Sequence, residues 1–88
     1  MNLTLQYHCD PGHGWIEIER KLAKKIMGEK YKTLSSFSYQ KGNMIYLEED
    51  SDAGKFLNCC KENNINHEVH QTHTNSDSPI RSYRSLRV

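Results

Sequence analysis

Two stretches of alternating apolar and polar residues, separated by a turn, constrain the fold of this chain more than any other feature. Residues 3–7 are Leu-Thr-Leu-Gln-Tyr, and residues 15–19 are Trp-Ile-Glu-Ile-Glu. A period of two is typical of a strand with one buried face. The Asp-Pro-Gly sequence at residues 10–12 favours a type II turn in which the glycine takes a positive φ. We therefore predict a β-hairpin over residues 3–18.

A helix is predicted after the hairpin. Leu22, Ala23 and Ile26 lie at helical spacing, and lysines occupy the opposite face. Gly28 then ends the helix. An alternative starts this helix at Trp15, because the apolar residues from there onward also fall on one helical stripe. Both interpretations remain open at this point, and the clean alternation favours the strand.

The second half of the chain repeats this order. Strands are predicted over residues 36–40 and 44–47, because apolar and aromatic side chains gather there on either side of a Lys-Gly-Asn turn. A helix over residues 53–60 follows, with apolar side chains at helical spacing. A last strand is predicted over residues 67–73, with Val69 pointing inward.

These elements give the order ββα-ββα-β in a single domain of residues 1–88. Residues 74–88 form a loop and a basic C-terminal segment of this domain. We expect an α+β fold with a small antiparallel sheet and both helices on one face. If the first helix starts at Trp15, the alternative is a βαββαβ ferredoxin-like sandwich.

Composition limits both the core and the range of partners. Hydrophobic residues make up 35% of the 88 residues, so the core is thin. Oligomerisation is a common compensation for a thin core, and we therefore expect a homo-oligomer. The net charge of +1 gives no overall attraction to nucleic acid or to anionic membranes. No run approaches the length of a transmembrane span, so neither is an expected partner.

The three cysteines are Cys9, Cys59 and Cys60. An odd number with one adjacent pair makes a poor disulfide framework, so we expect free thiols in a reducing cytoplasm. The first residues also lack the cationic start and the apolar stretch of a signal peptide. A cytoplasmic location is therefore expected.

Histidines are frequent for so short a chain. His8 and His13 flank the turn, and His67, His70 and His73 follow in the last predicted strand. Zinc needs three or four converging nitrogen, sulfur or oxygen ligands. His8, His13 and His73 are a possible set, although their spacing matches no standard motif. The competing interpretation, which we prefer, is that they are surface histidines and that the chain binds no metal.

An acidic run, Glu-Glu-Asp-Ser-Asp at residues 48–52, follows the second of these strands. Carboxylates there could bind a divalent cation or act as acid and base. Helix capping and the helix dipole explain the same run without a function. Cys9, beside two histidines, could be a nucleophile, but no motif supports one. We assign no catalytic residue.

The candidate binding site combines the turn with the basic C-terminal segment. Arg81 and Arg84 are expected to hold phosphate, and Tyr83 to stack on a base. If the segment folds back on the turn, exposed N–H groups of residues 12–14 can bind a phosphate oxygen. Trp15 is a second candidate for stacking, and a core position is its other interpretation. The predicted ligand-binding residues are Gly12, His13, Gly14, Trp15, Arg81, Tyr83 and Arg84.

Four segments carry a resemblance that covers nearly the whole chain. They are Asp-Pro-Gly-His-Gly-Trp at 10–15, Phe-Ser-Tyr at 37–39, Tyr-Leu-Glu-Glu-Asp at 46–50 and Ile-Arg-Ser-Tyr at 80–83. In these segments the chain resembles a set of small accessory proteins of bacteriophages and mobile elements. The resemblance implies a protein that acts in the host cytoplasm, commonly by binding. It carries over no activity and no catalytic residue.

The leading functional hypothesis is a non-enzymatic, phage-type binding protein. It would sequester a phosphate-bearing, nucleotide-derived small molecule and counteract host defence signalling, without a cofactor. A second hypothesis is an inhibitor of a host defence protein, with the acidic run 48–52 mimicking nucleic-acid charge. A third is a metal-dependent hydrolase or phosphodiesterase that uses the histidines and the carboxylates.

Overall fold

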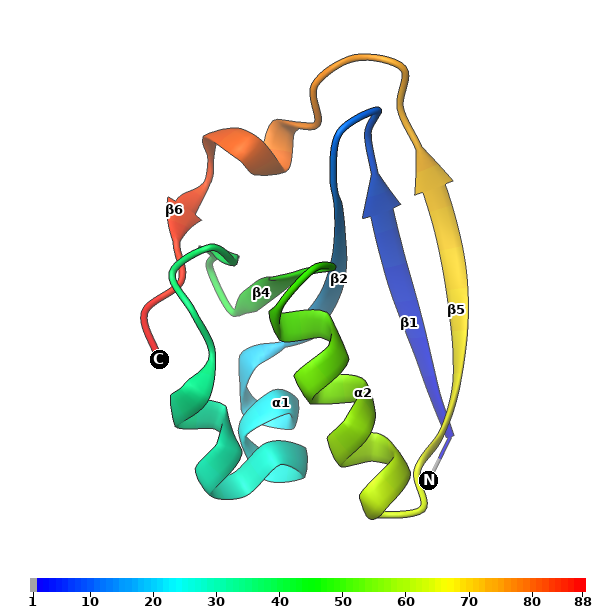
Figure 1. The fold of residues 1–88 in the computed structure, drawn as a ribbon, viewed down its shortest axis with the longest axis vertical. Coiled ribbons are helices and arrows are strands. Elements are labelled where there is room, and N and C mark those ends of the chain that lie inside the picture. Colours follow the sequence, from blue (N-terminus) through cyan, green and yellow to red (C-terminus); the bar gives the residue numbers. More distant parts are fainter. Residues whose placement is uncertain (1) are drawn as a thin grey trace.

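The computed structural model describes residues 2–88, which form six strands, two α-helices and two short 3-10 helices (Figure 1). In chain order they are β1 (Asn2–Cys9), β2 (Gly14–Glu19), α1 (Arg20–Met27), η1 (Gly28–Thr33), β3 (Tyr39–Lys41), β4 (Met44–Glu48), α2 (Asp52–Glu62), β5 (Asn66–His73), η2 (Pro79–Ser82) and β6 (Arg84–Ser85). The α+β class predicted from the sequence is confirmed. None of the helices in this part of the chain is long and apolar enough to cross a membrane.

β1 and β2 form the predicted hairpin. Tyr7 lies opposite Ile16, and His8 lies opposite Trp15. Trp15 is therefore a strand residue, and the alternative helix that starts there is wrong. Packing explains the choice, because the strand buries Ile16 and Ile18 under the helices and places Trp15 on the other face. A helix over the same residues would not separate Ile16 and Ile18 from Trp15 on two opposite faces.

The sheet has the strand order β5-β1-β2-β4-β3-β6 and is mixed. β5 runs parallel to β1, whereas the other neighbours are antiparallel. The predicted antiparallel pairing therefore holds everywhere except at this edge. The connection explains the exception: α2 carries the chain from β4 to the far edge, and a helical crossover of this kind can return a strand in the parallel direction.

Both helices pack on one face of the sheet, where they build the main core (Figure 1). Ala23 and Ile26 of α1 and Phe56 of α2 lie against Ile45 and other apolar residues of the central strands. Phe56 and Ile45 are completely buried. Full burial of a side chain of this size contributes about 1.5–3 kcal/mol, so a few such residues account for much of the stability of a small domain.

The C-terminal segment covers part of the opposite face. There Ile80 of η2 packs with Trp15 and Tyr46 in a second, smaller cluster. Further along, the N–H of Leu86 donates to the carbonyl of Ser38 at 2.8 Å. Residues 74–88, predicted as a loop and a basic segment, thus contain two short elements and close one edge of the sheet.

Two positions differ from the predicted strands. Phe37 lies in a turn before β3 and is 74% exposed. Val69, predicted to point inward, is 47% exposed, and all eight residues of β5 are exposed. The reason is the position of β5 at the sheet edge, because the helices cover the strands next to it rather than β5 itself.

Candidate functional site

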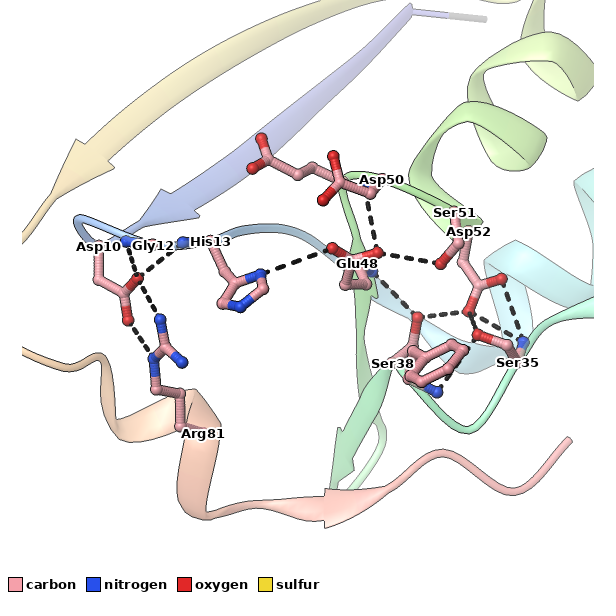
Figure 2. A network of polar contacts seen from close by, with 12 residues as sticks. Asp10, Gly12, His13, Ser35, Ser38, Glu48, Asp50, Ser51, Asp52 and Arg81 are labelled. Atoms are coloured by element: carbon pink, nitrogen blue, oxygen red, sulfur yellow. Dashed lines mark hydrogen bonds and ion pairs between the residues drawn. The ribbon is translucent and has the colours of Figure 1, made fainter.

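The buried carboxylate of Asp10 organises the turn between β1 and β2. It accepts hydrogen bonds from the backbone N–H groups of Gly12 at 3.0 Å and His13 at 2.9 Å. The Ser78 N–H donates to it at 2.9 Å, and two nitrogens of Arg81 donate at 2.6 and 2.8 Å (Figure 2). We call these five residues the turn–tail clasp. The basic segment thus folds back on the turn through Arg81, which was the condition for the candidate binding site.

The clasp stabilises the charged form of Asp10. Arg81 has the largest effect, followed by the N–H groups of Ser78, His13 and Gly12, and together they hold the pKa of Asp10 well below its ordinary value. Burial opposes this shift but is outweighed. The same contact with Asp10 raises the pKa of Arg81. Asp10 and Arg81 therefore form a permanent ion pair at neutral pH.

Neighbouring side chains pack closely against the two glycines of the turn and leave little room for a Cβ atom. A Cβ atom at Gly14 would lie 1.9 Å from the hydroxyl oxygen of Tyr7, and one at Gly12 would lie 2.9 Å from a nitrogen of Arg81. Neither glycine takes a positive φ, so the predicted type II turn is wrong. The side chain of Asp10 shapes the turn instead, as in an Asx turn.

This geometry changes the role predicted for the backbone at residues 12–14. The N–H groups of Gly12 and His13 already donate to Asp10, so they are not free donors for a phosphate. Gly14 lies in β2, where its carbonyl accepts the N–H of Glu49 at 2.9 Å. The turn therefore positions neighbouring side chains and does not itself form an anion site.

An open cleft of about 460 Å³ lies beside the clasp. Three of its lining residues are aromatic, namely Trp15, Phe37 and Tyr39. The others are polar: His13, Glu48, Asp50, Ser51 and Arg81. The cleft therefore joins the turn, the end of β4, the segment before β3 and the C-terminal segment. Four segments that are distant in the sequence thus meet at this cleft.

Three potential metal ligands converge in the cleft. One ligand atom each of His13, Glu48 and Asp50 lies within 4.8 Å of the other two, and His13 Nδ1 is 3.8 Å from Glu48 Oε1. Glu48 is held in place, because its Oε2 accepts the Asp50 N–H and the Ser51 hydroxyl, both at 3.0 Å (Figure 2). Ser51 makes no capping hydrogen bond to α2, so capping does not explain this part of the acidic run.

The other histidines of the predicted metal set have separate contacts. His8 Nε2 lies 2.7 Å from Glu17 Oε1. His73 Nδ1 lies 3.4 Å from Cys9 Sγ, at the edge of the sheet. Of His8, His13 and His73, the converging group found among residues 2–88 includes only His13.

Electrostatics favour a cation in the cleft. Arg81 is paired with Asp10. Among residues 2–88, the Glu48 carboxylate has one basic side chain within 4.0 Å, the imidazole of His13, and the Asp50 carboxylate has none. Like charges at these distances repel a bare phosphate, whereas a divalent cation is attracted.

The aromatic residues of the cleft are exposed to very different extents. Trp15 is 1% exposed, and its indole N–H has no hydrogen-bond partner within residues 2–88. The rings of His13 and Tyr39 lie 6.1 and 6.2 Å from it, and the Arg81 guanidinium lies 5.7 Å from its centre. The core interpretation of Trp15 is therefore the right one. Phe37, at 74% exposure, is the accessible platform.

Comparison with protein-family models, with curated proteins and with solved structures finds no match to this chain.

Two predicted ligand-binding residues lie outside the cleft lining. Tyr83 packs on Tyr46 with ring centres 5.2 Å apart, and Lys41 Nζ lies 4.8 Å from the Tyr83 ring. Arg84 is an exposed residue of β6, opposite Gln40. In contrast, His13, Trp15 and Arg81 do line the cleft. Of the two arginines predicted to hold phosphate, Arg81 therefore lines the cleft and Arg84 does not.

Sequence reasoning missed Phe37 and Tyr39 as site residues and gave Glu48 and Asp50 a structural explanation. These residues are separated from the turn by more than twenty positions. Their only signal is local composition, an aromatic pair and an acidic run. Strand pairing brings Trp15 opposite Glu48, and this register is what assembles the cleft.

Proposed function

We propose that the chain binds a phosphate-bearing, nucleotide-like small molecule in this cleft through a divalent cation. The convergence of His13, Glu48 and Asp50 within 4.8 Å carries the proposal. An imidazole with two carboxylates suits Zn²⁺ or Mn²⁺. Ligand atoms about 2.1 Å from such an ion lie roughly 3–4 Å apart. The exposed side chains of His13 and Asp50 can make this small adjustment around the fixed Glu48.

Arg81 is the second element of the proposal. Two of its five N–H donors point to Asp10, which holds the guanidinium in one orientation. The other three form no hydrogen bond with residues 2–88 and belong to a side chain that lines the cleft. Once a cation compensates Glu48 and Asp50, a phosphate can bridge the cation and this arginine, which is the usual partner of phosphate.

The exposed ring of Phe37 supplies the third element. Stacking of a base on an aromatic side chain contributes about 1–3 kcal/mol, and the exposed Phe37 lines the same cleft as the three potential metal ligands and Arg81. A ligand with both a phosphate and a base therefore fits the cleft better than either group alone. Its sequestration by a phage-type protein stays a prediction that rests on the sequence resemblance.

The test is a titration with Mn²⁺ followed by AMP. Trp15 is the single tryptophan and contacts His13 and Arg81, so its fluorescence reports both steps. We expect AMP to bind only after Mn²⁺, and Asp50→Asn to weaken Mn²⁺ binding about tenfold or more, about 1.4 kcal/mol. Asp77→Asn is the matched control, because Asp77 is also exposed but lies outside the cleft. AMP binding that is independent of Mn²⁺ would contradict the proposal.

A metal-dependent hydrolase is the second candidate, favoured by the number of ligands. Three protein ligands leave at least one coordination position for water, as catalytic zinc sites do. Incubation of the Mn²⁺-loaded protein with AMP and with a phosphodiester, followed by ³¹P NMR, separates binding from turnover. Hydrolysis that is lost in Glu48→Gln would move the assignment to an enzyme.

Inhibition of a host protein stays a prediction, which a pull-down from host lysate tests.

A further inference from the structure

The two edges of the sheet are built differently. The β6 edge is two residues long and carries Arg84. The β5 edge is eight residues long, pairs with β1 without a break in register, and exposes every residue. Proteins usually protect such edges with lysine, proline, a bulge or a covering segment. β5 has the sequence Asn-His-Glu-Val-His-Gln-Thr-His, with no lysine, arginine or proline and a single acid.

The direction of the free backbone groups follows from the pairing with β1. The Thr74 N–H donates to the Cys9 carbonyl at 2.9 Å. Each residue of a strand directs its N–H and its C=O to the same side, and the side alternates along the strand. The backbone groups of the even-numbered residues of β5 therefore point to β1. The N–H and C=O groups of His67, Val69, Gln71 and His73 therefore point outward, ready to pair with another strand.

We propose that β5 pairs antiparallel with β5 of a second copy, which joins the two sheets into one. A two-fold axis at Val69 places Val69 opposite its own copy and His67 opposite Gln71, both pairs formed by outward-pointing residues. The same axis places Glu68 of each copy opposite His70 of the other. A pair of a carboxylate with an imidazole and a pair of apolar side chains are both favourable across two strands, and the contact is closed and self-complementary.

Neighbouring registers fit less well. An axis at Glu68 would place two carboxylates directly opposite each other, which is destabilising. An axis at His70 would place two imidazoles opposite each other and leave Glu68 opposite Thr72. The register centred on Val69 therefore fits best, because it alone of the three places each carboxylate opposite an imidazole. In the monomer, Glu68 Oε2 and His70 Nε2 already lie 3.5 Å apart on one face of β5, so the dimer gathers both pairs into one cluster.

The proposed interface is independent of the cleft. β5 forms one edge of the sheet, whereas η2 and β6 lie toward the other (Figure 1). None of the residues of β5 lines the cleft. A single pair of eight-residue strands buries less area than a standard stable interface. We therefore expect a dimer that forms in the micromolar range and dissociates on dilution.

Sedimentation velocity over a dilution series tests the proposal. We expect the mass to rise from the chain mass of 10.3 kDa toward twice this value as the concentration increases. Val69→Lys places two lysines opposite each other and should raise the dissociation constant at least about tenfold. Val69 is exposed, so the monomer should keep its far-ultraviolet circular dichroism. Ser85→Lys, an exposed position of β6 at the opposite edge of the sheet, is the control and should leave the dimer unchanged.

Two further variants test the register. Glu68→Lys and His70→Glu should each weaken the dimer, and the double variant should restore it, because the opposed charges are then exchanged. A wild-type protein that stays monomeric at the highest concentration overturns the proposal. A dimer that is indifferent to Val69→Lys overturns it as well. Failure of the double variant to restore association overturns the register centred on Val69.

Discussion

The carboxylate of Asp10 connects the turn near the start of the chain with the segment near its end. Its ionisation makes the free energy of unfolding depend on pH in the acidic range. Its pKa is held well below the ordinary value of 3.8 in the folded state. A carboxyl group with a lowered folded pKa stabilises the protein above its unfolded pKa, and this stabilisation is lost as the pH falls. The relevant window therefore lies at about pH 4 and below.

We predict that Asp10→Asn lowers the free energy of unfolding at pH 7 and that the difference from the wild type shrinks as the pH falls through about 4. Urea denaturation of both proteins between neutral and acidic pH measures this difference. Asp77→Asn serves as the control, because Asp77 lies 4.0 Å from Arg81 Nε and is exposed. A difference that stays constant over the whole range would show that the charge of Asp10 is unimportant.

Gly14 gives a second prediction at a single residue. Gly14→Ala places a methyl group inside the Tyr7 side chain and should cost about 1–3 kcal/mol, the usual range for overpacking. Gly54→Ala is the matched control, because a Cβ there meets nothing within 4 Å and lies within α2. That exchange should stabilise the protein by roughly 0.5–1 kcal/mol. Thermal unfolding of the two variants distinguishes the steric clash of an added Cβ atom from the effect of reduced backbone conformational freedom.

At the level of elements, the first residue of α2 fixes the segment that carries Phe37. Asp52 is fully buried. Its carboxylate accepts the Ser35 N–H at 2.9 Å and the hydroxyls of Ser35 and Ser38 (Figure 2). These contacts hold the chain between η1 and β3 against the start of α2. The position of the exposed Phe37 therefore depends on a buried charge in a neighbouring helix.

We predict that Asp52→Ala lowers the free energy of unfolding by about 3 kcal/mol or more, because several hydrogen bonds to a charged group are lost together. Urea denaturation measures the change. Asn58→Ala, at an exposed position of the same helix, should stay within about 0.5 kcal/mol of the wild type. Equal effects of the two substitutions would contradict the role assigned to Asp52.

Elements with a local pattern were predictable from the sequence, and those defined by distant contacts were not. The alternation around Ile16 and the helical stripe around Ile26 each report burial on one face, and both elements form as expected. β5 has no buried face, so its sequence carries no sign of parallel pairing. Phe37 lies in a turn because Ser35 and Ser38 bind Asp52, a contact that no short window of sequence contains.

The candidate site was predictable to the same extent. Pairing of the turn with Arg81 followed from the composition of both segments. The choice between Arg81 and Arg84 depends on η2, which turns one side chain toward Asp10 and leaves the other on β6. The acidic run was recognised, but its meeting with His13 requires the register of β2 and β4.

For the whole molecule, a bound cation should stabilise the fold, because His13 of the turn meets Glu48 and Asp50 at the end of β4 only in the folded chain. A ligand at one hundred times its dissociation constant adds about 2.7 kcal/mol to the free energy of unfolding. We predict a stabilisation of this size with Mn²⁺ in the wild type and little in Asp50→Asn. Differential scanning calorimetry with and without Mn²⁺ measures it. Equal gains in both proteins would place the cation elsewhere.

The turn–tail clasp also has a consequence for the time scale of local opening. One carboxylate holds the amide hydrogens of Gly12, His13 and Ser78, so a single event that displaces the Asp10 side chain exposes all three. Amides more than sixty positions apart should then exchange with deuterium at one common rate, as a cooperative unit. A ligand that keeps Arg81 in place would slow all three together, and its residence in the cleft could be followed from either end of the chain.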